Sequence, residues 1–123
     1  MRDVWISGAF RTPIGTFEGV FARTSAVELG KVAAEKSLTA AGVEPSAVQE
    51  AVFGNVLQAG QGQNPARQVA VHVDIPEEVP AFTVNKVCAS GMKALDLGWQ
   101  SLQLGRADLI LADNVIDYPK VLE

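Results

Sequence analysis

Short apolar runs alternate with helical patterns along this 123-residue chain, and that alternation restricts the fold more than any other feature. Runs rich in β-branched and aromatic residues, typical of buried strands, are separated by segments whose apolar residues recur at helical spacing. We expect strands at residues 4–10, 51–56, 80–87 and 109–112, with helices between them. This order predicts an α/β fold with a mostly parallel mixed sheet and helices on both faces.

Capping signals mark the ends of the first two expected helices. Ser25 and Glu28 have the spacing of a capping box, and Gly42 suits the left-handed residue that follows a helix. Asn64 followed by Pro65 predicts the N-cap and the first residue of a second helix. These signals fix the helix boundaries without reference to any other part of the chain.

The third expected helix runs from near Cys88 to Leu104 and is apolar around most of its circumference. A helix with such a pattern is buried on several sides. One small layered domain does not supply that much cover. We therefore expect the helix to pack against a further layer, contributed by another chain or by a part of the protein absent from this sequence.

Cys88 is the only cysteine, and it lies where the third expected strand passes into the third expected helix. In the first turn of a helix, unpaired backbone N–H groups and the positive end of the dipole favour a thiolate. The thiolate is the nucleophilic form, so this placement suggests covalent catalysis. The alternative is a buried, inert core cysteine, since free cysteine is among the most buried residue types.

Composition excludes several classes of function. The net charge is −4 and there is no basic run, which argues against nucleic-acid binding. We find no signal peptide and no apolar run of spanning length, so we expect a cytoplasmic protein with no membrane partner. No residue spacing supports a metal site. The only histidine, His72, lies in the second helical pattern and is interpreted as a packing or partly exposed residue.

The segment from Asn85 to Ala94, NKVCASGMKA, resembles the acyl-enzyme motif of thiolases, the acetyl-CoA C-acetyltransferases and 3-ketoacyl-CoA thiolases. Further segments resemble stock segments of the same family, in the same order. They lie at residues 11–15, 54–60, 62–67 and 80–84. The resemblance covers nearly the whole chain and implies a thiolase-like N-terminal half.

The resemblance implies a mechanism in which Cys88 attacks the thioester of an acyl-CoA and becomes acylated. The backbone N–H of Cys88 would contribute to an oxyanion hole. The residues after the nucleophile would bind substrate, and they are Ala89, Ser90, Gly91 and Met92. Coenzyme A enters as a substrate, with no resident cofactor and no metal, and the family places the reaction in fatty acid metabolism.

The resemblance also implies a subunit interface near the cysteine, formed by Asn64, Arg67, Val84 and Asn85. We therefore expect a homo-oligomer, such as a dimer, or pairing with another thiolase subunit. The alternative function is a non-catalytic dimerisation or regulatory module that pairs with full-length thiolase subunits.

Members of the family are several-fold longer than this chain. Their loop domain and C-terminal half, which supply an activating histidine and a second cysteine, have no counterpart in this sequence. We expect residues 1–112 to form a partial N-terminal domain and residues 113–123 a divergent C-terminal tail, because Asp113 and Asn114 stand where the family has a glycine pair. We expect the chain to be a fragment with little activity alone.

Overall fold

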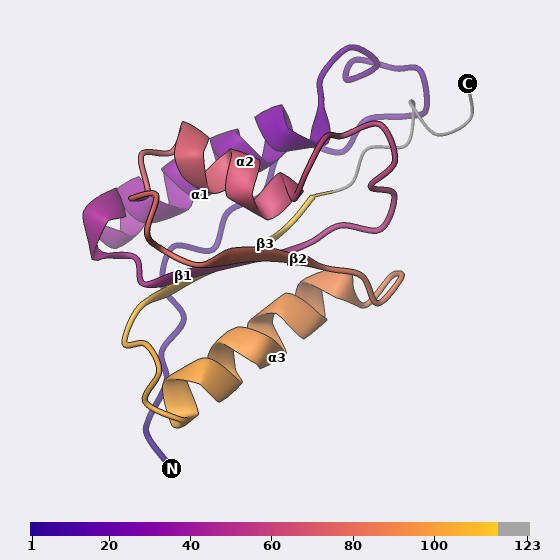
Figure 1. The fold of residues 1–123 in the computed structure, drawn as a ribbon. Coiled ribbons are helices and arrows are strands. Elements are labelled where there is room, and N and C mark those ends of the chain that lie inside the picture. The colour runs from indigo at the N-terminus through magenta and orange to yellow at the C-terminus, as the bar shows by residue number, and fades with distance from the viewer. Residues whose placement is uncertain (116–123) are drawn as a thin grey trace.

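The computed structural model describes residues 1–115, and these fold into a small parallel sheet covered by helices (Figure 1). In chain order the elements are α1 (Ala26–Ala41), the short 3-10 helix η1 (Pro45–Ala47), β1 (Glu50–Gly54), α2 (Pro65–His72), β2 (Ala81–Val84), α3 (Ser90–Gln103) and β3 (Ile110–Asn114). Among the described helices, none has the length and apolar character needed to cross a membrane.

β1 is the central strand of the sheet, whose order is β2-β1-β3. Both pairings are parallel, and Ala51 pairs with Ala81 on one side and with Leu111 on the other. The middle of β1 is fully buried, as expected for a parallel strand covered on both faces. The carboxyl ends of all three strands therefore lie along one edge of the sheet.

Helices cover both faces of the sheet, with α1 and α2 on one face and α3 on the other (Figure 1). The main hydrophobic core includes Phe53 from β1, Val69 from α2 and Ala34 from α1, each completely buried. The expected α/β fold with helices on both faces is confirmed. The expected strand at 109–112 continues to Asn114, and the strand expected at 80–87 ends at Val84 because the chain then turns.

The capping signals read from the sequence are present in the structure. The side chain of Ser25 accepts a hydrogen bond from the Glu28 N–H, and Glu28 reaches back to the Ser25 N–H, completing the capping box. Gly42 adopts the left-handed conformation that ends α1, and the Asn64 side chain caps α2 with Pro65 as its first residue. These caps satisfy backbone groups that the helices leave free.

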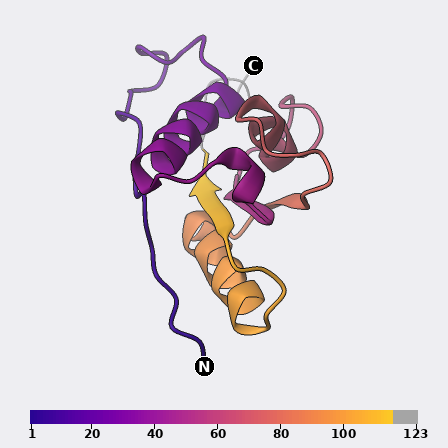
Figure 2. The same ribbon diagram turned by 90° about the vertical axis from the view of Figure 1, so that its left-hand side faces the viewer.

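The strand expected at residues 4–10 is wrong: in the structure this segment belongs to no sheet. It runs as an extended trace along the side of the molecule (Figure 2), and Trp5 and Ile6 are 87% and 75% exposed. A groove of about 1110 Å³ lies between this segment, α3 and β3. Without a neighbouring strand to pair with, an apolar run forms no strand.

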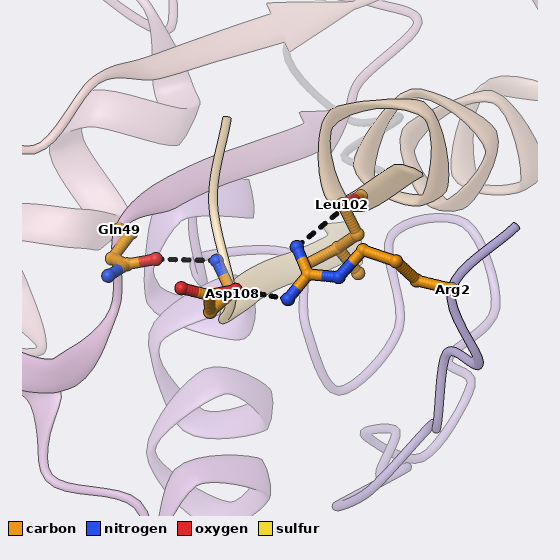
Figure 3. A network of polar contacts seen from close by, with 4 residues as sticks. All are labelled: Arg2, Gln49, Leu102 and Asp108. Atoms are coloured by element: carbon orange, nitrogen blue, oxygen red, sulfur yellow. Dashed lines mark hydrogen bonds and ion pairs between the residues drawn. The ribbon is translucent and has the colours of Figure 1, made fainter. Parts of the chain in front are cut away.

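Side-chain contacts hold the beginning of this segment instead (Figure 3). Arg2 donates to the carboxylate of Asp108 and to the carbonyl of Leu102, at the turn between α3 and β3. Asp108 in turn donates its N–H to the side chain of Gln49, just before β1, at 2.6 Å. The contacts therefore connect the start of the chain to the amino-terminal ends of β1 and β3.

α3 is buried along one narrow face. Ser90, Ala94 and Gly98 are buried, and α3 contacts β1 and β3. Large apolar side chains on the rest of the helix are exposed, with Met92 at 77% and Trp99 at 43%. Within residues 1–115 the helix is therefore not buried on several sides, contrary to what its pattern predicts, and the further layer stays a prediction.

Candidate active site

Cys88 lies in the turn that joins the carboxyl end of β2 to the start of α3. Its thiol is free and the residue is exposed, so the interpretation as a buried core cysteine is wrong. The residue stands just before the N-cap, Ala89, and not in the first helical turn as expected. The nucleophile proposed from the sequence is thus presented to solvent at the edge where the parallel strands end.

Backbone N–H groups at this turn are available to a ligand. Ala89 and Ser90 donate their N–H groups to Lys86 and Val87 carbonyls, which closes the turn tightly. Within the described residues, the N–H groups of Cys88, Gly91 and Met92 donate to no protein acceptor. Free donors at a helix start can stabilise a developing negative charge on a bound molecule.

Close packing against β1 fixes where α3 begins. A Cβ built on Gly54 would lie 2.6 Å from the Ser90 carbonyl carbon and 2.8 Å from the Gly91 nitrogen. A Cβ on Gly91 would lie 2.9 Å from the Cβ of Asn114, on β3. Two glycines therefore let the first turn of α3 rest directly on the ends of β1 and β3, and this sets the position of the cysteine turn.

The four residues expected to bind substrate lie in or next to this turn, with different exposure. Met92 is exposed, and Ala89 and Gly91 are partly exposed. Ser90 is 1% exposed, and its hydroxyl is already engaged with the backbone of Lys86 and Val87. The backbone of the turn and the Met92 side chain are therefore accessible, whereas the Ser90 side chain faces the protein.

Two of the residues expected at an interface lie at the start of α2 and bind the strand beside it. Asn64 donates to the Ala81 carbonyl at 2.9 Å and accepts from the Thr83 hydroxyl at 2.8 Å. Arg67 donates to the Val79 carbonyl at 2.7 Å through Nη2, while its buried Nη1 has no partner among the described residues. Both side chains thus fix β2 against α2.

The other two expected interface residues end β2. Val84 is partly exposed, and its carbonyl accepts from the Asn55 N–H. Asn85 is exposed and donates to the Val56 carbonyl at 3.1 Å, which ties the cysteine turn to the loop after β1. On the described part of the chain, the outer edge of β2 pairs with no other strand.

In the part of the chain that the structure describes, His72 and the acidic residues form no second chemical centre. His72 is exposed at the end of α2. Within residues 1–115, no group of three His, Cys, Asp or Glu side chains is arranged to hold a metal ion.

Asp113 was not identified from the sequence as a buried acid. Its burial on β3 raises the pKa of the carboxyl group to about 6, partly opposed by a hydrogen bond from the Asn114 N–H. Its position in a strand directly after apolar Leu111 and Ala112 was the available signal. The carboxyl group lies along the groove beside the N-terminal segment.

Comparison with known proteins matches this geometry to one family. Residues 4–114 match the family model described as "Thiolase, N-terminal domain". A probable acetyl-CoA acyltransferase from Staphylococcus aureus (strain NCTC 8325) is 50% identical over 115 residues, which is 94% of this chain and 29% of the relative. A relative with the same description from Staphylococcus epidermidis is 48% identical over 115 residues, with the same coverage of both chains.

Solved structures give the same result. A thiolase from Ascaris suum in complex with coenzyme A superposes with a TM-score of 0.78 at 42% identity, over 79% of this chain and 25% of that one. The acetyl-CoA acetyltransferase of Bacillus anthracis gives 0.84 at 33% identity, over 89% of this chain and 28% of that one. These matches confirm the resemblance read from the sequence, and this chain spans less than a third of the length of each relative.

Proposed function

Because the chain belongs to the thiolase family, we propose that it is the nucleophile-bearing part of a thiolase-type acyltransferase, in which Cys88 carries the acyl group. The observation that carries this proposal is the exposed thiol between the end of β2 and the start of α3. The Cys88 thiolate attacks the carbonyl carbon of an acyl-CoA, a new C–S bond forms, and coenzyme A leaves as its thiolate. The acyl group then passes to an acetyl-CoA carbanion or to free coenzyme A.

The turn that follows Cys88 supplies the groups that would meet the thioester. The free N–H groups of Cys88, Gly91 and Met92 are candidate donors to the oxyanion of the tetrahedral intermediate. The small residues Ala89 and Gly91 leave room for the substrate, and the exposed Met92 offers it an apolar contact. The proposal treats coenzyme A as a substrate and assigns no resident cofactor.

A general base is not among the groups at this turn. The only histidine, His72, stands on α2 and is exposed. General-base assistance is typically worth about 10²–10⁴-fold in rate. We therefore expect the isolated chain to be acylated slowly and to turn over little.

We also propose that residues 1–112 form a partial N-terminal domain and that residues 113–123 form a divergent tail. Residues 116–123 of this tail lie outside the described structure.

Mass spectrometry of the intact chain after incubation with acetyl-CoA tests the proposal. We expect one acetyl group, located on Cys88 by peptide mapping and absent from Cys88→Ser. Ser101→Ala serves as the control and keeps the adduct, because Ser101 lies on α3 and its side chain makes no hydrogen bond within residues 1–115. Absence of any adduct in the wild-type chain after prolonged incubation would contradict the assignment of Cys88, as would acetylation that persists in Cys88→Ser.

The uncovered apolar surface of α3 favours one alternative, a non-catalytic module that dimerises or pairs with a complete thiolase subunit. The residues proposed for such an interface are Asn64, Arg67, Val84 and Asn85, near the outer edge of β2. In either case we place the protein in the cytoplasm and in fatty acid metabolism, as a dimer or a larger oligomer. Co-expression with a full-length thiolase tests the alternative. A chain that stays monomeric and does not co-purify with the thiolase contradicts it.

A further inference from the structure

Val87, the residue before Cys88, has an unusual backbone conformation. Its φ is 49°, in the left-handed region. A β-branched residue rarely occupies this region, and such a conformation persists only where the surroundings enforce it. The Val87 side chain is 64% exposed, so packing does not hold it. The cause must therefore lie in the contacts of its backbone.

Two side chains hold that backbone from both sides. The Val87 N–H donates to Oδ1 of Asn85 at 2.9 Å, and the Val87 carbonyl accepts from Oγ of Ser90 at 2.7 Å. Each holding residue is itself fixed. Asn85 donates to the carbonyl of Val56, and the buried Ser90 hydroxyl accepts from the Lys86 N–H at 2.8 Å. We call this set of contacts the Val87 clamp.

We infer that Asn85 and Ser90 are positioning residues for Cys88, because by clamping Val87 in the left-handed conformation they set the direction in which the neighbouring cysteine leaves the turn. This inference rests on the proposed function of Cys88 as the acylated nucleophile. The Ser90 side chain then holds the turn and does not bind substrate. Its hydroxyl group donates to one backbone carbonyl and accepts from one backbone N–H, and the residue is 1% exposed. The backbone of Ser90 stays in the turn that would meet the substrate.

The substitution Val87→Gly, combined with a variant that weakens the clamp, tests whether the clamp positions Cys88 or only stabilises the fold. Glycine adopts positive φ without steric cost, so Val87→Gly keeps the turn when the clamp is weakened. We expect Ser90→Ala to slow acetylation of Cys88 by acetyl-CoA by about 10²-fold, the loss expected for a nucleophile displaced by about 1 Å. Alkylation by iodoacetamide makes no demand on orientation and should change about 3-fold or less. Adding Val87→Gly should restore most of the acetylation rate.

Ser101→Ala on α3 is the matched control and should leave both rates unchanged. Where Ser90→Ala fails to fold, Asn85→Ala replaces it, because Asn85 is exposed, and Asn85→Asp keeps the acceptor for the Val87 N–H. Acetylation unchanged in both Ser90→Ala and Asn85→Ala would overturn the inference. Equal loss of acetylation and alkylation that Val87→Gly does not restore would also overturn it.

The Val87 clamp can also be tested if the proposed function itself fails. Should the wild-type chain acquire no acetyl group, the backbone NMR chemical shifts of residues 87 and 88 decide the question alone. The clamp predicts that Ser90→Ala moves these shifts away from left-handed values and that the double variant with Val87→Gly returns to them. Shifts that stay left-handed in both Ser90→Ala and Asn85→Ala would show that the two side chains do not hold the turn.

Discussion

Among residues 1–115, Asp113 is the carboxyl group whose pKa is raised by its partly buried position. It lies on β3 opposite Phe53, and burial raises its pKa from 3.8 to about 6. A carboxyl group whose pKa is raised on folding stabilises the fold below its unfolded pKa and loses that contribution as the pH rises through its folded pKa. At neutral pH the chain therefore carries a charge where the fold prefers a neutral group.

Asp113→Asn should remove this cost. The amide keeps an acceptor for the Asn114 N–H and carries no charge. We expect the variant to gain about 2–3 kcal/mol in free energy of unfolding at pH 7, and no advantage below pH 4. Urea denaturation of both proteins between pH 4 and 7 measures the difference.

Glu78→Gln is the control for this measurement. Glu78 is exposed, so the variant removes one negative charge from the surface and none from the interior. It should shift the free energy of unfolding little across the same range. An advantage of Asp113→Asn that did not grow between pH 4 and 7 would show that the carboxylate is solvated in the folded chain.

At the scale of elements, the contact between β1 and α3 controls the cysteine turn. The start of α3 rests on Gly54 so closely that no side chain fits between them, since a Cβ there would meet backbone atoms of Ser90 and Gly91. Backbone cannot swing aside as a flexible side chain can. The end of the central strand thus sets where the helix begins, and with it the place of the nucleophile.

Two glycine-to-alanine changes where α3 packs on the sheet should have opposite effects. Gly54→Ala forces the helix start away, and we expect a loss of about 1–3 kcal/mol from overpacking. Gly98→Ala lies further along α3, where the new Cβ would make ordinary contact with Ile110 at 3.4 Å, and should gain up to about 1 kcal/mol from helix propensity. Thermal unfolding compares the two, and equal effects would contradict the role assigned to Gly54.

Helix boundaries could be predicted from neighbouring residues in the sequence. The conformation of residues 4–10 and of Val87 depends on contacts with other parts of the chain. The caps at Ser25, Gly42 and Asn64 depend on neighbouring residues only, and all three were read correctly from the sequence. The run at residues 4–10 has the pattern of a strand, but a strand also needs a partner, which no local pattern supplies. The left-handed Val87 was likewise not predicted, although Asn two residues before it is a known turn former.

At the scale of the whole molecule, the N-terminal segment is attached near both ends, by Arg2 at its start and by Gly8 against the backbone of Ser37 on α1, with a groove behind it. At the start of the segment, the Arg2 side chain donates to Asp108 and to the Leu102 carbonyl, and Gln103 forms hydrogen bonds with both the N–H and the carbonyl of Arg2. The ion pair is largely exposed, with side-chain exposures of 52% and 70%. We therefore expect the ion pair to contribute little to global stability and to act mainly on the position of residues 3–7.

Arg2→Ala should separate these two effects. We expect a change in free energy of unfolding of about 1 kcal/mol or less, together with a clear fall in the NMR order parameters of residues 3–7. Lys31→Ala breaks another exposed ion pair, on α1, and should leave those order parameters unchanged. Unaltered order in Arg2→Ala would mean that contacts along the groove, and not the arginine, keep the segment in place.

The parallel sheet has a consequence for how fast the chain reaches this structure. Ala51 meets Ala81 and Leu111, so every strand pairing joins residues that are remote along the chain. Loop closure must precede each of these pairings, and topologies dominated by remote contacts fold slowly for their size. During that delay the apolar central strand is open to mispairing, and α2, which packs against it in the final structure, is the element that would shield it.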